Sequence, residues 1–338
     1  MSMGCETIRA GIVGVGTYAP ERVLTNADIQ QIVDTSDEWI RTRTGILERR
    51  LASADEATSD LALTASRRAL DDAGVRPEEL DLVIAATNTP DMLFPATACL
   101  LQDRLGAANA GAFDLLAGCT GFIYGVAVGA QFIAAGTART VLVAGAETLS
   151  RILNWRDRNT CVLFGDAAGS VVLRRVPGDR GILATALGSD GSGGHLLQLP
   201  AGGSRQPATA ETVERNLHCL TMNGREVFKF AVRAMEDGAN EVLRRAGMTG
   251  ADVDFLIPHQ ANIRIIEHAA KKMKLPMERV AVNVDRYGNT STASIPLALE
   301  ESLHSGKIKD GDNVVMVGFG AGLTWAGLLI KWYDYKKR

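Results

Sequence analysis

The stretch of sequence that decides the fold is Phe113-Asp-Leu-Leu-Ala-Gly-Cys119-Thr-Gly-Phe-Ile-Tyr-Gly-Val126. Its apolar start predicts a strand, Gly118 predicts a tight turn, and the small residues that follow predict a buried helix running to Gly136. Cys119 would then lie at the first turn of this helix, where unpaired N–H groups and the positive end of the helix dipole favour a nucleophilic thiolate. Most free cysteines are buried core residues, so this stretch alone leaves both interpretations open.

The second half of the chain repeats features of the first. In the first half Ala69-Leu-Asp-Asp-Ala-Gly74 is followed by Asp81-Leu-Val-Ile-Ala, and in the second Val242-Leu-Arg-Arg-Ala-Gly247 is followed by Asp254-Phe-Leu-Ile-Pro. Cys119 precedes Gly136 by 17 residues, and Asn289 precedes Gly306 by 17. So long a period indicates two related α/β halves rather than a solenoid. We therefore predict an N-terminal half over residues 1–178 and a C-terminal half over residues 179–338.

Overlaying the two halves brings three polar residues together. Cys119 and Asn289 fall at equivalent strand-to-helix turns, and His259 follows a buried strand of the second half. We expect all three at one edge of a sheet, where α/β proteins place their catalytic groups. A cysteine beside a histidine and an asparagine would form a nucleophile with two hydrogen-bond donors.

Composition narrows the class of protein. A chain of 338 residues, 46% of them hydrophobic, can fill two cores or one large one, and a net charge of −3 gives no global basic field for nucleic acid. The five scattered cysteines argue against a disulfide framework and for a reducing cytoplasm. The N-terminus lacks the apolar core of a signal peptide, and the apolar stretch from Thr120 to Gly136 is too short to span a membrane. We therefore expect a cytoplasmic protein with no membrane partner.

Apolar strand candidates alternate with helical stretches along the whole chain, which predicts sheets covered on both faces. The predicted strands are Ile8–Val15, Leu80–Ala86, Gly111–Leu116, Thr140–Ala144, Ala168–Leu173, Ile182–Leu187, Val253–Pro258, Val280–Val284, Asn313–Val317 and Leu323–Lys331. Clear amphipathic helices are predicted over Ser59–Ala73 and Gly224–Ala246.

Two other kinds of site are disfavoured. Gly14-Val-Gly16-Thr-Tyr-Ala19 matches a dinucleotide fingerprint, but Pro20 follows where that fingerprint must open a helix. The five histidines show no i, i+4 pairing and no cysteine companions, so we predict no metal site.

With these residues in view, the chain resembles the β-ketoacyl-acyl-carrier-protein synthase III family of the thiolase superfamily over essentially its full length. Elongating condensing enzymes carry a second histidine where this chain has Asn289, so the initiating branch fits better. Ala321 stands where the family usually has a glycine. The matching pieces are Asp34-Thr-Ser-Asp-Glu-Trp39-Ile-Arg-Thr-Arg43-Thr-Gly45, the Cys119 stretch, Phe164-Gly-Asp166-Ala-Ala-Gly169, Pro258-His259-Gln-Ala-Asn-Ile-Arg264-Ile, Gly288-Asn289-Thr-Ser and Gly318-Phe-Gly320-Ala321-Gly322-Leu-Thr-Trp.

The resemblance implies a thiolase-like fold of two duplicated α/β halves in αβαβα layers, and a reaction in two steps. An acyl-coenzyme A acylates Cys119, with the backbone N–H groups of Cys119 and Ala321 binding the oxyanion. Malonyl-acyl carrier protein then loses CO₂, and its enolate, stabilised by His259 and Asn289, attacks the acyl-enzyme. No metal or organic cofactor is implied.

The resemblance also implies binding residues and a homodimer. The coenzyme A contacts would be Thr35, Trp39, Arg43 and Arg158, with the adenine between Trp39 and Arg158. Phe94 and Phe164 would form the acyl pocket, Phe94 by crossing the dimer interface. The basic residues expected to dock the carrier protein are Arg225, Lys229, Arg264, Lys271 and Lys272.

Two alternatives stay open at the level of sequence. One is a relative in the same superfamily that makes a polyketide, an alkylquinolone precursor or a hydroxymethylglutaryl thioester. The other is a cysteine-dependent acyltransferase or thioesterase that forms no carbon–carbon bond.

Overall fold

The computed structural model describes residues 9–337, which form two large sheets. The first sheet has the order β1-β7-β6-β4-β5 and the second the order β8-β13-β12-β11. The strands of the first are β1 (Arg9–Tyr18), β7 (Ala167–Val176), β6 (Thr140–Glu147), β4 (Leu82–Ala86) and β5 (Gly111–Leu115). The strands of the second are β8 (Gly181–Ser189), β13 (Thr324–Lys331), β12 (Asn313–Gly320) and β11 (Phe255–Pro258).

The two sheets share their pattern of strand directions. β1, β7 and β6 pair antiparallel and β6 and β4 pair parallel, just as β8, β13 and β12 pair antiparallel and β12 and β11 pair parallel. Within residues 9–337 no strand of the second sheet corresponds to β5, so the predicted strand Val280–Val284 is wrong. Only one bridge joins Leu256 to Val280, because Asn283 N turns away to Gln260 Oε1 at 3.0 Å and helix α10 (Val284–Tyr287) begins.

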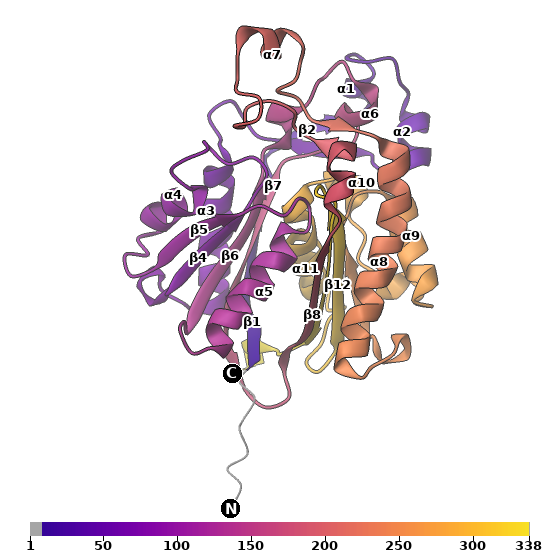
Figure 1. Ribbon diagram of the computed structural model, residues 1–338. Helices are drawn as coiled ribbons and strands as arrows, with labels where there is room; N and C mark the ends of the chain where they lie inside the picture. Colours follow the sequence, from indigo (N-terminus) through magenta and orange to yellow (C-terminus); the bar gives the residue numbers. More distant parts are fainter. Residues whose placement is uncertain (1–8, 338) are drawn as a thin grey trace, which may run out of the picture.

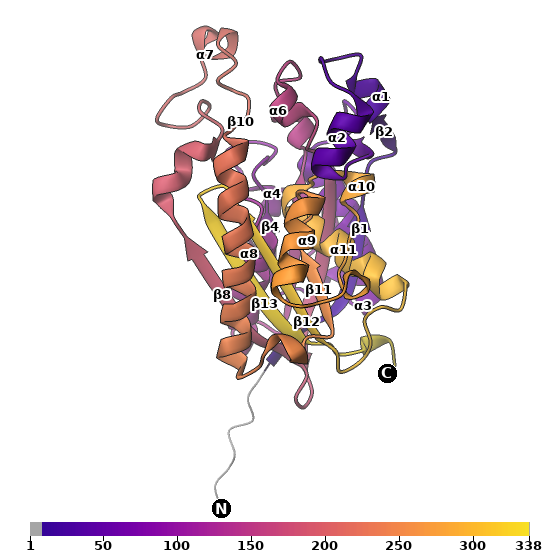
Figure 2. The ribbon, with the colours of Figure 1, turned by 90° about the vertical axis from the view of Figure 1, so that its right-hand side faces the viewer.

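Helices cover the sheets in five layers, αβαβα (Figure 1). The helices α5 (Gly121–Ala134) and α11 (Ser294–His304) lie between the two sheets. One outer layer holds α3 (Thr58–Ala73) and α4 (Thr97–Leu105). The other holds α8 (Gly224–Ala246) and α9 (Ile263–Lys272), which cross the face of the second sheet in Figure 2.

The small residues of α5 have a packing reason. A Cβ on Gly125 would come 2.8 Å from Val143 of β6, and one on Gly121 would come 3.0 Å from Thr292. Glycine therefore lets this central helix approach both β6 and the segment just before α11. The helix begins two residues after Cys119 and fixes that residue at the centre of the molecule.

Short elements gather at one end of the molecule, at the top of Figures 1 and 2. They are α1 (Asn26–Ile29), α2 (Asp37–Thr44), α6 (Arg158–Cys161), α7 (Ala210–Glu214), the pair β2 (Arg22–Thr25) and β3 (Glu48–Leu51), and the pair β9 (Leu197–Gln198) and β10 (Thr221–Met222). Trp39, on α2, is thereby brought beside residues from the middle of the chain.

The other predicted strands lie within a few residues of the observed ones. The predicted start at Ile8, and the N-terminal segment considered as a signal peptide, lie outside the described residues. Within residues 9–337, no helix has the length and apolar character needed to cross a membrane.

Candidate active site

Cys119 lies in the turn between β5 and α5. Gly118 takes a φ of 58°, and the Thr120 hydroxyl donates to Ala117 O at 2.6 Å, which closes the turn. A Cβ on Gly118 would come 2.5 Å from Ala321 N, so only glycine lets the connection between β12 and β13 approach this closely. The turn therefore sets the Cys119 thiol directly against the second half of the chain.

Burial dominates the acidity of this thiol. Cys119 is 8% exposed, and burial raises its pKa to about 12, with the charge of Glu147 acting in the same direction. Hydrogen bonds from Ser291 and from the backbone N–H groups of Cys119 and Ala321 lower the pKa. Backbone N–H groups therefore favour the thiolate as expected, but burial outweighs them.

The same two N–H groups form a candidate oxyanion hole. Ala321 does not have a positive φ; in the described chain only three non-glycine residues do. The unusual φ of 145° belongs to the next residue, Gly322. An alanine is therefore tolerated at this place. Gly320 is the position without room, since its Cβ would lie 2.3 Å from Cys119 N.

His259 follows β11 and is completely buried. Its Nδ1 lies 2.7 Å from Ser294 Oγ, which also accepts from Gln260 N at 3.4 Å, and Phe319 packs edge-on with ring centroids 5.3 Å apart. Burial lowers the pKa of His259 to about 3, so the imidazole is neutral. Its Nε2 has no partner within the described protein and is free to meet a ligand.

Asn289 is held by its backbone. Its N–H donates to Leu163 O at 2.8 Å, and its carbonyl accepts from Gly165 N at 3.0 Å. Its Oδ1 accepts from Ser291 N at 2.9 Å, so the amide is oriented with Nδ2 as the remaining group. Asn289 is thus fixed as a hydrogen-bond donor.

Two neighbouring cavities share no lining residue; Cys119 lines one of them, and His259 and Asn289 line neither. The inner cavity, of about 850 Å³, is lined by Cys119, Phe164 and Ala321 together with mostly apolar side chains. The outer cavity, of about 690 Å³, is lined by Trp39, Arg43 and Arg225, which were predicted. It is also lined by residues that the sequence did not indicate, among them Asn159, His195, Thr221, Asn223 and Asn262. Two pairs of consecutive residues lie between the cavities. Leu163 and Thr221 line the outer cavity, and their neighbours Phe164 and Leu220 line the inner one.

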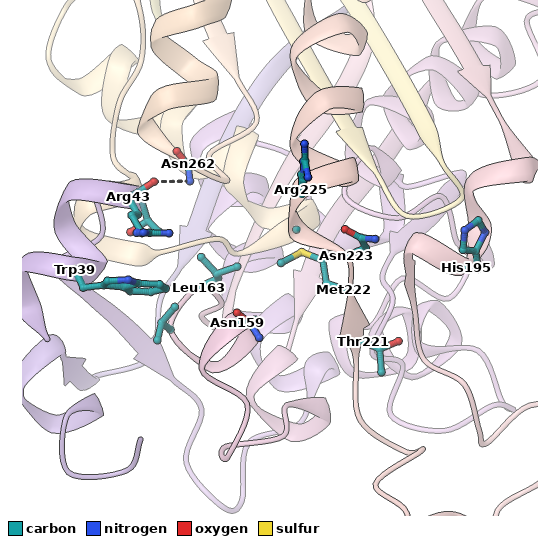
Figure 3. Close-up of a pocket in the computed structure, with 13 residues that line it drawn as sticks. Trp39, Arg43, Asn159, Leu163, His195, Thr221, Met222, Asn223, Arg225 and Asn262 are labelled. Atoms are coloured by element: carbon teal, nitrogen blue, oxygen red, sulfur yellow. Dashed lines mark hydrogen bonds between the residues drawn. The ribbon is translucent and has the colours of Figure 1, made fainter. Parts of the chain in front are cut away.

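Two arginines already stack on Trp39, and one of them, Arg43, lines the outer cavity. The guanidinium carbons of Arg43 and Arg158 lie 4.7 and 5.0 Å from the centre of the Trp39 ring. Figure 3 shows Trp39 and Arg43 on one side of this cavity and His195 on the other, with Asn262 Nδ2 donating to Arg43 O at 2.9 Å. The gap between Trp39 and Arg158 leaves no room for an adenine ring, so the expected sandwich requires Arg158 to move. Arg158 and Thr35 do not line the cavity.

An exposed apolar patch lies beside the inner cavity. Leu93, Phe94 and Leu116 are 78%, 84% and 75% exposed, and Leu93 and Leu116 also line the cavity. Phe94 itself does not line it within one chain. Contiguous exposed apolar residues of this kind mark interaction surfaces.

The predicted basic residues are all exposed but differ in their pairing. Lys229 lies 2.7 Å from Glu226 and Lys272 lies 3.2 Å from Glu236. Arg264 and Lys271, both on α9, have no acidic partner among residues 9–337. No cluster of side chains suited to a metal ion occurs in the described part of the chain.

Glu147 was missed by the sequence analysis. It ends β6, is completely buried and receives hydrogen bonds from Asn88 and Thr89. Burial raises its pKa, and those hydrogen bonds oppose the rise. The available signal was an acid at the end of the apolar run Thr140–Glu147.

Comparisons with known proteins show which family the chain belongs to. The family described as 3-oxoacyl-[acyl-carrier-protein (ACP)] synthase III matches residues 113–191, and the family of its C-terminal part matches residues 243–332. A β-ketoacyl-[acyl-carrier-protein] synthase III from Caldanaerobacter subterraneus is 60% identical over 97% of this chain and 99% of its own.

Solved structures confirm the thiolase-like fold. The 3-oxoacyl-[acyl-carrier-protein] synthase III of Aquifex aeolicus is 48% identical, with a TM-score of 0.89 over 96% of this chain and 100% of its own. The priming β-ketosynthase of a polyketide biosynthetic pathway is 37% identical, with a TM-score of 0.88 over 96% and 97%. Matched along nearly its whole length by such relatives, the chain belongs to the β-ketoacyl-[acyl-carrier-protein] synthase III family of condensing acyltransferases.

Proposed function

We propose that the chain initiates type II fatty acid synthesis. An acyl-coenzyme A with an acetyl or short branched primer acylates Cys119, and condensation with malonyl-acyl carrier protein then gives β-ketoacyl-acyl carrier protein, coenzyme A and CO₂. The observation that carries the proposal is the Cys119 thiol, which borders an apolar cavity of about 850 Å³ with two backbone N–H groups at its sulfur.

In the first step the Cys119 sulfur attacks the thioester carbonyl, the bond to coenzyme A breaks, and the thiol proton leaves with coenzyme A. The N–H groups of Cys119 and Ala321 stabilise the developing oxyanion, because they are fixed before the reaction begins. The inner cavity then receives the acyl chain beside Phe164.

In the second step the malonyl group loses CO₂ and its enolate carbon attacks the acyl-enzyme, releasing Cys119. Ser294 Oγ accepts from Gln260 N, so its proton is available for His259 Nδ1, and the neutral imidazole then carries its own proton on Nε2. His259 Nε2 and Asn289 Nδ2 therefore both serve as donors to the enolate oxygen. No metal or organic cofactor takes part in this scheme.

The outer cavity would bind coenzyme A. Trp39 offers an aromatic face for adenine, and Arg43 and Arg225 offer charge for the phosphates. The adenine would replace the Arg158 side chain on the indole, with Thr35 at the same entrance. The exposed residues Arg264 and Lys271 would join Arg225, Lys229 and Lys272 in docking the acidic carrier protein.

We infer a cytoplasmic homodimer from the remaining features. The exposed apolar patch of Leu93, Phe94 and Leu116 would be covered by a second copy, whose Phe94 would then close the neighbouring inner cavity. The scattered cysteines, unpaired in the described chain, suit a reducing compartment.

The experiment is a primer series. The protein is incubated with acetyl-, isobutyryl- and octanoyl-coenzyme A, each with malonyl-acyl carrier protein, and the carrier-protein products are weighed by mass spectrometry. A carrier-protein product whose acyl group contains the carbons of the primer plus two from the malonyl group supports the proposal. Acyl transfer or hydrolysis without added carbon would contradict it.

A second candidate is priming of a polyketide pathway, favoured by the likeness to the priming β-ketosynthase. The chemistry is the same, and the carrier protein differs. A clear preference for a polyketide carrier protein over a fatty acid carrier protein, at equal concentration in the same assay, would select this candidate.

A further inference from the structure

The inner cavity has a smaller neighbour that takes no part in the scheme above. This small cavity has a volume of about 320 Å³ and shares two lining residues with the inner cavity, Ala54 and Arg151. Much of its remaining lining is apolar, and an alkyl chain gains free energy when it leaves water for such surroundings. The apolar lining residues are Leu24, Ile32, Leu51, Ala52 and Trp155, and the polar ones are Arg22 and Ser150.

One apolar cluster borders both cavities. Its buried members are Leu149, Leu153 and Phe164, and Ile152 and Trp155 pack against them. Leu149, Ile152 and Phe164 line the inner cavity, whereas Trp155 lines the small one. The two cavities are therefore adjacent compartments around the same cluster.

Arg151 lies at the boundary between these compartments. It belongs to the 3₁₀ helix η2 (Leu149–Ile152), and its Nη2 donates to three carbonyl oxygens of one loop. The acceptors are Ser53 O at 2.6 Å, Ala54 O at 3.3 Å and Glu56 O at 3.2 Å. The guanidinium thus joins η2 to the loop that supplies the other shared lining residue.

A buried carboxyl group ties the same two segments together. Asp166 is completely buried, and it accepts from Ala52 N at 2.8 Å and from Ser150 N at 2.8 Å. Ala52 lies two residues before Ala54, and Ser150 lies directly before Arg151. Both sides of the boundary are therefore fixed to one anchor, and the Arg151 side chain spans the distance between them.

We propose that Arg151 is a specificity-determining residue that closes the inner cavity toward the small cavity and so limits the length of the acyl chain carried by Cys119. The inference rests on the proposed acylation of Cys119 and deepens it by naming what restricts the primer. Without the Arg151 side chain the two cavities would join, and a longer chain could continue past Ala54 into the small cavity.

The test compares the unaltered protein with Arg151→Ala, Ala52→Leu and the double variant. Each protein is mixed with acetyl- or decanoyl-coenzyme A in a single turnover, and the gain in intact mass gives the rate of acylation. Ala52 lines only the small cavity, so Ala52→Leu fills that cavity and leaves the inner one unchanged. Arg245→Ala is the matched control, because Arg245 also donates to a backbone carbonyl, Thr185 O at 2.8 Å, but lines neither cavity.

We expect Arg151→Ala to raise the ratio of the decanoyl rate to the acetyl rate about ten- to hundredfold, because several methylene groups gain apolar surroundings. Ala52→Leu alone should leave this ratio unchanged. In the double variant it should bring the ratio back close to that of the unaltered protein, because both side chains act on one path. Arg245→Ala should not change the ratio.

An unchanged ratio in Arg151→Ala, or a raised ratio that Ala52→Leu does not reduce, would overturn the inference. Thermal melting shows whether each variant is folded. If Arg151→Ala is not, Arg151→Lys decides, because lysine keeps a cation for the three carbonyl groups but is narrower than a guanidinium. Its ratio should rise about threefold, and an unchanged ratio would overturn the inference equally.

The same assay separates this inference from the proposed function. If the unaltered protein is acylated by acetyl-coenzyme A and the ratio does not respond to Arg151, the inference alone has failed. If neither thioester acylates the unaltered protein, the proposed function has failed, and the inference fails with it.

Discussion

The reactivity of Cys119 is a balance between burial and three hydrogen bonds. Burial would shield an acyl group on Cys119 from water, and it raises the pKa of the free thiol to about 12. The groups that lower this pKa, Ser291 and the N–H groups of Cys119 and Ala321, also surround the sulfur where charge changes during acyl transfer. The motif around Cys119 could be found from sequence, but desolvation depends on packing and could not.

This balance predicts the pH dependence of acylation. The thiolate fraction should rise about tenfold per pH unit below the thiol pKa, so the single-turnover rate of acylation should increase steadily from pH 6 to 9. No inflection should occur near pH 6.5, because His259 is already neutral with a pKa of about 3. A plateau reached near pH 7 in a stopped-flow profile would show that Cys119 ionises far more easily than its burial implies.

His259 and Asn289 should serve the second step. His259→Ala and Asn289→Ala should each lower decarboxylative condensation by about 10²–10³-fold while acyl transfer stays within about tenfold, because each removes one donor to the enolate oxygen. The two half-reactions are measured separately, as acyl-enzyme formation and as CO₂ release from malonyl-acyl carrier protein. Equal losses in both would identify His259 as a general base acting on Cys119 instead.

The candidate oxyanion hole lies where the β5–α5 turn, with Cys119, meets the end of β12, with Gly320. A Cβ on Gly118 or on Gly320 would clash with the backbone of the other element. The strands themselves followed from their apolar runs, but the run Val280–Val284 did not form a strand. That run can pair with only one neighbour, and the side-chain contact of Gln260 with Asn283 diverts it into α10.

The close approach of Gly320 to Cys119 predicts different results for substitutions at Gly320 and at its neighbour Ala321. Gly320→Ala should slow acylation by about 10²-fold, because a Cβ placed 2.3 Å from Cys119 N must displace an oxyanion donor. Ala321→Gly should change the rate less than threefold, because Ala321 already adopts an ordinary backbone conformation. Single-turnover acylation with acetyl-coenzyme A measures both, and equal rates for the two variants would place the oxyanion elsewhere.

At the scale of the whole molecule, duplication explains the site. Two sheets of matching order place the turn after β5 against the end of β12, where Gly318 lies beside His259. The repeat in the sequence predicted Cys119, His259 and Asn289 at one sheet edge, but not the part taken by β12. The binding cavities were less predictable, because Asn159, His195 and Thr221 come from the short elements gathered at one end of the molecule. None of these residues lies in a repeated pattern, so their convergence depends on tertiary structure alone.

The surface around the outer cavity predicts how the partner binds. Arg264→Glu should raise the KM for malonyl-acyl carrier protein several-fold and leave acylation by acyl-coenzyme A unchanged, because Arg264 lies outside the cavity lining. The effect should shrink as salt rises through about 0.1–0.5 M. Arg244→Glu is the control, since Arg244 pairs with Glu241 on α8 and faces neither cavity. If Arg264→Glu left this KM unchanged at low salt, the basic residues of α9 would be ordinary solvent-exposed charges and not a docking surface.

Acylation of Cys119 is tested most directly by the intact mass of the protein after incubation with an acyl-coenzyme A. We expect a gain of one acyl group, carried by the Cys119 peptide and absent from Cys119→Ala. Isobutyryl-coenzyme A in place of acetyl-coenzyme A should shift the added mass accordingly. Acylation that persists in Cys119→Ala, or that maps to the buried thiol of Cys161, would contradict the account.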